Sequence, residues 1–161
     1  MTGPRVAIVA VSHSAELAAG VAELAAQMAP DVTIIGVGGS DGGLGTSFDA
    51  ITDALQRADS GEGIVVLYDL GSARMTSESA IEFLDPRLAG RIDIVDAPLV
   101  EGAIAASHSA GGLAQLSAVA LGQGLTCHAV WTRVAVSGPP SAGSSRRSSS
   151  QDVTSRCHTS R

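Results

Sequence analysis

The first structured segment that the sequence predicts reads Val6-Ala-Ile-Val-Ala-Val-Ser-His-Ser14. Its apolar part, residues 6–11, is unbroken and has the length of a strand, a pattern typical of a strand buried on both faces of a parallel sheet. The run ends at polar residues, so His13 directly follows the strand. Because ligands of such sheets bind at the carboxyl ends of the strands, His13 is the first candidate functional residue.

Three further apolar runs, each followed by a helical pattern, continue along the chain. Strands are expected at 6–11, 32–37, 64–68 and 91–95. Apolar residues at helical spacing mark four helices: Leu17, Val21, Leu24 and Met28; Phe48, Ile51 and Leu55; Met75, Ile81 and Leu84; Val100, Ile104, Leu113 and Leu116. Pro30 and Pro86 are expected to stop the first and third helices. These βα units predict an α/β fold, a doubly wound, mainly parallel four-stranded sheet with helices on both faces.

Length and hydropathy bound the class of protein. The chain has 161 residues, of which 45% are hydrophobic and 16% are charged. This is enough for one sizeable core and too little for two ordinary domains. The sequence shows neither a run of 18 apolar residues nor the features of a signal peptide. We therefore expect no membrane contact and, by default, a cytoplasmic location.

The charges are distributed unevenly. Residues 1–122 carry fifteen acidic residues and five Arg, a net charge of −10, whereas residues 123–161 carry one acidic residue and five Arg, a net charge of +4. An acidic body disfavours nucleic acid as a partner, because neutralising phosphates requires clustered basic residues. The chain contains no Lys. This excludes a P-loop lysine, a Schiff-base lysine and a lysine general base.

Composition also divides the chain into a domain at 1–122 and a basic Ser/Arg-rich tail at 123–161. Residues 137–161 contain nine serines and hardly any apolar side chain. Such a segment buries too little surface to offset its chain entropy, so we expect it to be disordered. The alternative is a shift of the coding frame near residue 121. The tail also holds both cysteines and two incidental histidines, so no disulfide framework or paired-cysteine metal motif is expected: Cys127, Cys157, His128, His158.

His13 lies where a helix is expected to begin, and the free N–H groups and the dipole of a helix amino end favour an anion. Imidazole is a good nucleophile toward phosphorus, so a phosphohistidine is one hypothesis; a structural or capping His is the other. His108 occupies the same Ser-His-Ser triplet but lies within an expected helix. We expect His108 to be an ordinary surface residue, which makes it an internal control.

Two more features belong to the same edge of the predicted sheet. Asp69 ends the third strand, where its carboxylate would fix the tautomer of His13 or simply cap a helix. The loop at 36–47 has six glycines in twelve residues and ends in Thr46 and Ser47. Such a loop lets the backbone approach a phosphate closely, or it is a flexible connection. The loop matches neither the dinucleotide-binding nor the Walker pattern.

Three segments together resemble the mannose-type IIA domains of the bacterial sugar phosphotransferase system. They are Val6–Ser14, the run Gly-Gly-Leu-Gly-Thr-Ser at 42–47, and Val-Leu-Tyr-Asp-Leu-Gly-Ser-Ala-Arg-Met at 66–75. The resemblance covers about residues 5–120 in order. Residues 69–73 and 97–103 favour the phosphocarrier subunits of phosphoenolpyruvate-dependent dihydroxyacetone kinases over the sugar-transporter members.

The resemblance implies a phosphotransferase activity and a set of site residues. His13 would be phosphorylated, Asp69 would orient its ring, and Thr46 would support the ring or the phosphate. Phosphate-binding groups are expected at Ser14, Gly45, Ser47, Gly71 and Ser72. The family's mechanism needs no metal and no cofactor.

The resemblance also implies partners. His13 would accept phosphate from the phosphocarrier protein HPr and pass it to ADP on the ADP-binding dihydroxyacetone kinase subunit (DhaL). A homodimer is expected. Two alternatives stay open: a IIA component of a mannose-type sugar transporter, and a non-enzymatic domain that binds a phosphorylated ligand.

Overall fold

The computed structural model of the protein describes residues 5–112. Its strands are β1 (Ala7–Ser12), β2 (Ile34–Gly38), β3 (Ile64–Tyr68) and β4 (Ile92–Val95). Its helices are α1 (Ala15–Met28), α2 (Phe48–Ala58), α3 (Gly71–Glu82), α4 (Pro86–Ala89) and α5 (Leu99–Gly111). Within these residues the strands form one parallel sheet in the order β2-β1-β3-β4. The predicted α/β class and parallel sheet are confirmed.

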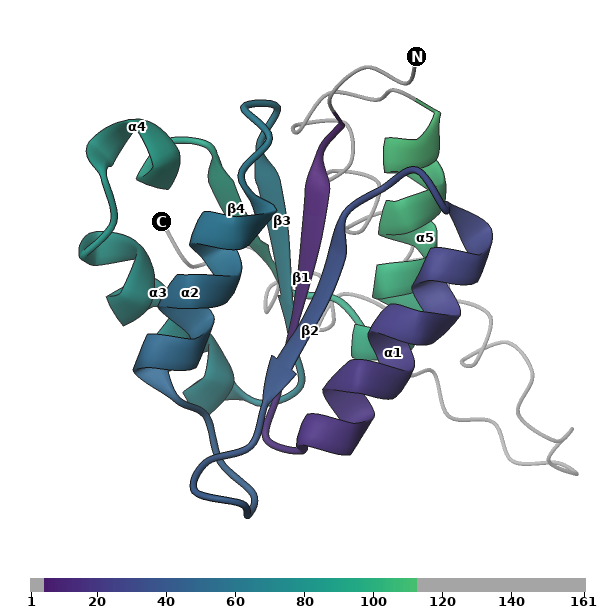
Figure 1. The fold of residues 1–161 in the computed structure, drawn as a ribbon. Coiled ribbons are helices and arrows are strands. Elements are labelled where there is room, and N and C mark those ends of the chain that lie inside the picture. Colours follow the sequence, from purple (N-terminus) through teal and green to yellow (C-terminus); the bar gives the residue numbers. More distant parts are fainter. Residues whose placement is uncertain (1–4, 113–161) are drawn as a thin grey trace, which may run out of the picture.

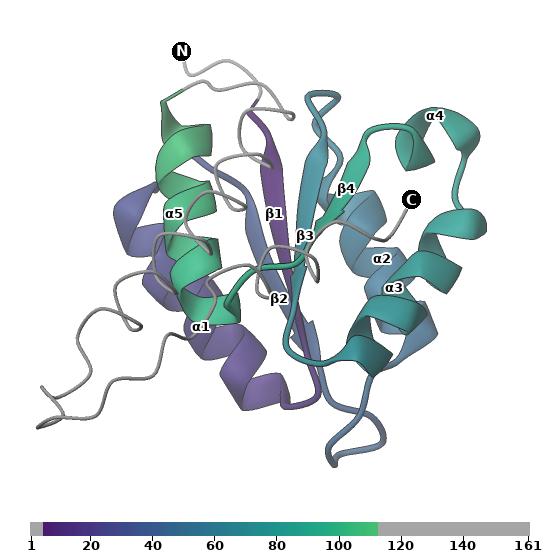
Figure 2. The ribbon, with the colours of Figure 1, turned by 180° about the vertical axis from the view of Figure 1, so that it is seen from behind.

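The helices cover both faces of the sheet, as predicted. Helices α1 and α5 lie on one face and α2 and α3 on the other (Figure 1). The view from behind shows the same three layers, with β1 and β3 in the middle of the sheet (Figure 2). Because β1 and β3 are covered on both sides, every residue of β1 is buried, which explains its unbroken apolar sequence.

Alternate residues of the central strands feed two separate cores. Ile8 and Ala10 of β1 point toward α1 and α5, whereas Ala7, Val9 and Val11 point toward α2 and α3. This is the period-two alternation of a strand, with both faces apolar. A one-residue shift of β1 would exchange the two sets without exposing either, so its register depends on side-chain size as well as polarity.

The inward face of α1 uses small side chains. Of the four apolar residues whose spacing predicted this helix, Val21 is buried, whereas Leu17, Leu24 and Met28 are 44%, 48% and 54% exposed. The buried residues are Ala18, Val21 and Ala25. Small side chains suit this face because α1 lies very close to β2: a Cβ added at Gly36 would lie 2.2 Å from the carbonyl oxygen of Ala18. The apolar spacing therefore identified the helix, but not most of the residues that face the sheet.

Helix α3 shows the same effect. Met75, one of the residues whose spacing predicted this helix, is 68% exposed, and the buried side chains are Ala73, Ser77 and Ala80. The hydroxyl of Ser77 is satisfied within the helix, where it donates to the carbonyl oxygen of Ala73 at 2.8 Å. A polar residue can therefore occupy the buried face at little cost.

Pro86 also acts differently from the prediction. Helix α3 ends at Glu82, before the proline, and Pro86 begins the short helix α4. Proline is favoured at a first helical position because its missing N–H has no partner there in any case. Asp85 caps this turn by accepting from the N–H of Arg87.

Helix α5 ends at Gly111, and Leu113, Leu116 and the predicted tail lie outside the described residues. In the described part of the chain, no helix combines the length and apolar character needed to cross a bilayer.

Candidate active site

The sheet order brings His13 and Asp69 together. Each follows the last residue of a strand, and β1 and β3 are neighbours in the sheet. The N–H of Asp69 donates to the carbonyl oxygen of Val11 at 3.2 Å, which continues the pairing past the end of β3. The helices that follow these strands, α1 and α3, lie on opposite faces, so this position is the topological switch point of the sheet.

The ring of His13 is held by the carboxylate of Asp69. Nδ1 of His13 lies 3.0 Å from Oδ1 of Asp69, and the two side chains are 23% and 18% exposed. A carboxylate only accepts hydrogen bonds, so Nδ1 carries the hydrogen in this contact. In the neutral imidazole the lone pair is then at Nε2.

Asp69 accepts from four donors in total. Besides the ring of His13, they are the N–H of His13 at 2.8 Å, the hydroxyl of Ser12 at 2.9 Å and the N–H of Leu70 at 2.7 Å. Burial acts to raise the pKa of Asp69, but the hydrogen bonds outweigh it and lower the pKa below its ordinary value. Asp69 is therefore a firmly ionised and oriented carboxylate.

Ser72 contacts the other ring nitrogen. Its hydroxyl oxygen lies 2.8 Å from Nε2 of His13. Since Nε2 bears the lone pair in the neutral ring, the Ser72 hydroxyl donates to it. Ser72 is in the first turn of α3, where neither its own N–H nor that of Gly71 has a partner among the described residues. These donors, predicted to bind phosphate, lie beside the nucleophilic nitrogen.

The glycine-rich loop is tied to the site through Gly45 and Thr46. The N–H of Gly45 donates to the carbonyl oxygen of His13 at 2.8 Å. Thr46 Oγ1 lies 3.1 Å from Oγ1 of Thr76 on α3. The structure thus joins Thr46 to α3 and not directly to the ring of His13. A role of Thr46 in supporting the phosphate stays a prediction.

The two remaining predicted hydroxyls cap helices. Ser14 accepts from the N–H of Leu17 at 3.2 Å at the start of α1, and Ser47 accepts from the N–H of Ala50 at 3.3 Å at the start of α2. Ser14 also donates to the carboxylate of Glu16. Each Ser satisfies an otherwise unpaired helix N–H. Binding of phosphate by Ser14 or Ser47 stays a prediction.

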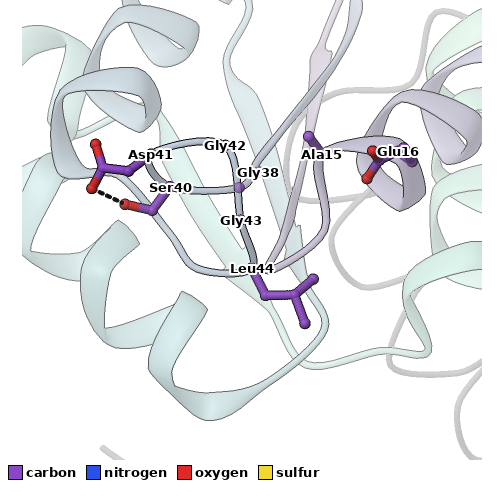
Figure 3. Close-up of a pocket in the computed structure, with 9 residues that line it drawn as sticks. Ala15, Glu16, Gly38, Ser40, Asp41, Gly42, Gly43 and Leu44 are labelled. Carbon is purple, nitrogen blue, oxygen red and sulfur yellow. Dashed lines mark hydrogen bonds between the residues drawn. The ribbon is translucent and has the colours of Figure 1, made fainter.

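A pocket of about 460 Å³ lies next to the site, between the glycine-rich loop and the first turn of α1. Figure 3 shows Glu16 on one side of it and Ser40 and Asp41, which are hydrogen-bonded to each other, on the other side. Two carboxylates repel an anion, and none of the described residues that line this pocket is cationic. The candidate phosphate position is therefore at Nε2 of His13 rather than in the pocket.

Ser12 is a site residue that the sequence prediction omitted. It is fully buried, donates to Asp69 and accepts from the N–H of Ser14 at 3.1 Å. A buried hydroxyl needs a partner, so a Ser that closes an apolar strand just before a candidate nucleophile was the available signal. Thr76 gave no such signal, because its contact with Thr46 spans 30 positions of the chain.

Other titratable residues lie away from this group. Burial first, and then the nearby charge of Asp96, raise the pKa of Tyr68. Tyr68 is thus a neutral donor at ordinary pH. His108 is exposed in the last turn of α5, as predicted. Within residues 5–112, no three His, Cys, Asp or Glu side chains are grouped as a metal site would require.

These contacts give His13 the geometry that a nucleophile requires. The nitrogen with the lone pair contacts the Ser72 hydroxyl, the opposite nitrogen is fixed by a carboxylate, and the first turn of α3 carries two N–H groups that have no partner among the described residues. An oriented imidazole with nearby neutral donors can form a bond to an electrophile and stabilise the charge that arrives with it.

Comparisons with known proteins agree with this arrangement. Residues 7–119 match the EIIA-man family model, described as "PTS system fructose IIA component". A Listeria innocua protein, phosphoryl donor subunit DhaM of PEP-dependent dihydroxyacetone kinase 2, is 42% identical over 104 residues, which are 63% of this chain and 83% of that protein. The crystal structure of the unknown function protein EF1359 has 35% identity and a TM-score of 0.68, covering 74% of this chain and 92% of that one.

A DhaM subunit from Providencia stuartii is 37% identical over 119 residues, or 71% of this chain. This chain spans only 25% of the length of that relative. The Listeria protein is matched over most of its length, and the family model over most of this chain. The chain therefore belongs to the EIIA-man family and, within that family, to the group of DhaM proteins.

Proposed function

We propose that this protein is a phosphohistidine carrier, a phosphotransferase subunit that takes up a phosphoryl group on Nε2 of His13 and passes it on. The observation that carries the proposal is the fixed ring of His13: Nδ1 is bound to Asp69 and the lone pair of Nε2 is directed to the edge of the sheet. The names of the DhaM relatives, which are phosphoryl donor subunits, support the same role.

The transfer balances as two displacements at phosphorus. The lone pair of Nε2 attacks the phosphorus of a phosphorylated donor protein, the new N–P bond forms, and the bond to the donor breaks with its electron pair. Charge then develops on the ring, where Nδ1–H is held by the carboxylate of Asp69. In the second step an acceptor oxygen attacks, and the electron pair of the N–P bond returns to Nε2.

The groups next to His13 suit a carrier that must both bind and release a phosphoryl group. The Ser72 hydroxyl, which donates to Nε2 in the unloaded state, is placed to donate to a phosphoryl oxygen instead. The N–H groups of Gly71 and Ser72, which have no partner within residues 5–112, add neutral donors. Neutral donors hold a phosphoryl group less firmly than a charged clamp, since hydrogen bonds with both partners ionised are the strong ones.

The proposed partners go beyond the names of the relatives, which support a phosphoryl donor subunit of a PEP-dependent dihydroxyacetone kinase. We infer that HPr is the donor, that ADP on the kinase subunit DhaL is the acceptor, and that the protein works as a homodimer in the cytoplasm. No cofactor or metal enters the proposed transfer. The family description as a IIA component favours one alternative, a sugar-transporter role with a IIB protein as the acceptor.

The test is phosphorylation by phosphoenolpyruvate with enzyme I and HPr. The wild-type protein and His108→Ala are expected to gain one acid-labile phosphate, and His13→Ala none. Phosphorylation of His13→Ala would reject the proposal. The labelled protein is then offered to ADP-loaded DhaL and, separately, to a IIB protein; transfer to the IIB protein alone would favour the alternative.

The same three side chains also have the order of a Ser-His-Asp catalytic triad, with Ser72 in the position of the nucleophile. This observation favours acyl transfer as a second candidate function. A serine-reactive phosphonate discriminates between the two. The carrier proposal expects no labelling of Ser72, whereas a hydrolase would be labelled and would lose the label in Ser72→Ala.

A further inference from the structure

The hydroxyl of Thr76 lies between the glycine-rich loop and the residue that contacts His13. Thr76 Oγ1 donates to the carbonyl oxygen of Ser72 at 3.0 Å and lies 3.1 Å from Oγ1 of Thr46. A hydroxyl has one hydrogen, and Thr76 uses its hydrogen at Ser72. Thr46 is therefore the donor in the contact between the two threonines.

These contacts form part of a closed series of contacts that begins and ends at His13. Gly45, next to Thr46, donates to the carbonyl oxygen of His13 at 2.8 Å. Ser72 lies 2.8 Å from Nε2 of the same residue. Starting from His13, the contacts thus run through the loop to Thr76, from there to Ser72, and back to the imidazole. Thr76 is the residue of α3 that the loop contacts in this series.

The first turn of α3 lacks the support that the corresponding helices have. Ser14 caps α1 and Ser47 caps α2, each with a side-chain hydrogen bond. The N-cap of α3 is Leu70, which makes no such bond. An uncapped first turn frays more readily, and Ser72 is in that turn. A hydrogen bond from outside the helix therefore helps to hold this turn.

We propose that Thr76 is a positioning residue for His13: it joins the glycine-rich loop to α3 and thereby holds the Ser72 hydroxyl at Nε2. The inference rests on the proposed function for one of its two readouts, the rate of phosphoryl uptake. The second readout, the state of the unphosphorylated ring, is independent of that function.

The first test measures kcat and KM for uptake from phosphorylated HPr. Thr76→Val removes the hydroxyl and nearly keeps the shape; Thr76→Ser keeps the hydroxyl. We expect kcat to fall about 10-fold in Thr76→Val, within the roughly 100-fold loss that a 1 Å misplacement can cause. KM is expected to stay the same, and Thr76→Ser to recover most of the rate.

Ser77→Ala is the matched control, because the Ser77 hydroxyl makes the same type of bond to the residue four positions earlier and that bond stays within α3. An equal loss of kcat in Ser77→Ala, or no loss in Thr76→Val, would overturn the proposal. Thr46→Val is expected to match Thr76→Val, and the double variant to be no worse than either. Additive losses would show that the threonines act separately.

The second test records the ¹⁵N chemical shift of Nε2 in the unphosphorylated protein, with Ser72→Ala as the reference for a ring without its donor. Thr76→Val is expected to shift toward this reference, and Thr76→Ser to stay near the wild type. An unchanged shift in Thr76→Val would contradict the positioning role. If the wild-type protein takes up no phosphate, the proposed function fails while this test still decides the role of Thr76.

Discussion

Four donors from two strand ends surround the carboxylate of Asp69. Three of them come from Ser12 and His13, so the same carboxylate that orients the ring also fixes the backbone that carries it. This double use explains why a partly exposed Asp can hold a histidine in a single orientation. In the proposed transfer, Asp69 would fix one tautomer of His13 and balance the charge that develops on the imidazole.

Replacing Asp69 by Asn is expected to slow phosphoryl uptake by at least about 10-fold, the lower end of the losses seen when a group that orients a catalytic side chain is removed. The amide of Asn offers an N–H₂ group that favours the tautomer with its hydrogen on Nε2. That tautomer has no lone pair at the nucleophilic position. Single-turnover uptake from phosphorylated HPr measures the change. Asp93→Asn, at an exposed position of β4, is the control and is expected to behave like the wild type.

The lowered pKa of Asp69 predicts how the free energy of unfolding depends on pH. Its pKa is lowered on folding from the ordinary value of 3.8. The native state therefore gains stability from the ionised carboxylate above that value, and loses it as the pH falls through the lowered pKa. Urea unfolding at neutral pH and near pH 3 is expected to show a smaller acid loss in Asp69→Asn than in the wild type. An equal loss in both proteins would assign the acid sensitivity to other groups.

At the scale of elements, the close contact between α1 and β2 sets the packing on one face of the sheet. The Cβ position of Gly36 is occupied by the backbone of α1. The helix can approach this closely because Ala18 and Ala25 face the sheet. The larger apolar residues of α1 are consequently turned outward.

Gly36→Ala is expected to destabilise the protein by about 1–3 kcal/mol, the usual cost of forcing extra atoms into a packed interior. The added Cβ would lie 2.2 Å from a backbone oxygen, which cannot move as a flexible side chain would. Gly20→Ala within α1 is the matched control, since nothing lies within 4 Å of its added Cβ. It is expected to stabilise by about 0.5–1 kcal/mol, because Ala loses less chain entropy in a helix. Urea midpoints measure both, and destabilisation of the same size in both variants would contradict this account.

The sequence predicted the elements well and their faces less well. The apolar run of β1 and the helical spacing of α2 identify those elements because burial and local periodicity coincide there. For α1, the hydrophobic spacing pointed to Leu17 and Leu24, whereas close packing selected Ala18 and Ala25. The side-chain size that fits at a helix–sheet contact depends on the residues of the facing strand. The sequence of the helix alone does not show which strand faces it.

The site was predictable as far as strand ends were concerned. His13 and Asp69 follow strands that must end at the same edge of a parallel sheet, so their proximity required only the correct strand order. The contact of Thr46 with Thr76 was not predictable in this way. It depends on how the glycine-rich loop, which follows β2, folds against α3, which follows β3.

At the scale of the whole molecule, the fold provides one edge at which loops from both halves of the sheet meet. The β2-β1-β3-β4 order sends the chain to opposite faces after β1 and β3 and so opens that edge to a partner. The family match ends at residue 119, near the predicted domain boundary at 122. The tail of opposite charge follows this boundary.

A chain shortened after residue 122 is expected to accept phosphate at the same rate as the full chain. In the described part of the chain, residues 5–112, His13 already has hydrogen bonds to Asp69, Ser72 and Gly45. The measurement is the rate of uptake from phosphorylated HPr, with circular dichroism as a check of folding. A folded but inactive shortened chain would show that residues 123–161 take part in the transfer.

The most direct test of the carrier mechanism is the position of the phosphate in the phosphorylated full-length protein. Correlated ³¹P and ¹⁵N NMR spectra identify the atom bonded to phosphorus. We predict a single phosphoramidate at Nε2 of His13, because Asp69 occupies Nδ1 and leaves the lone pair at the opposite nitrogen. Phosphate at Nδ1, or a phosphate ester at Ser72, would contradict the account.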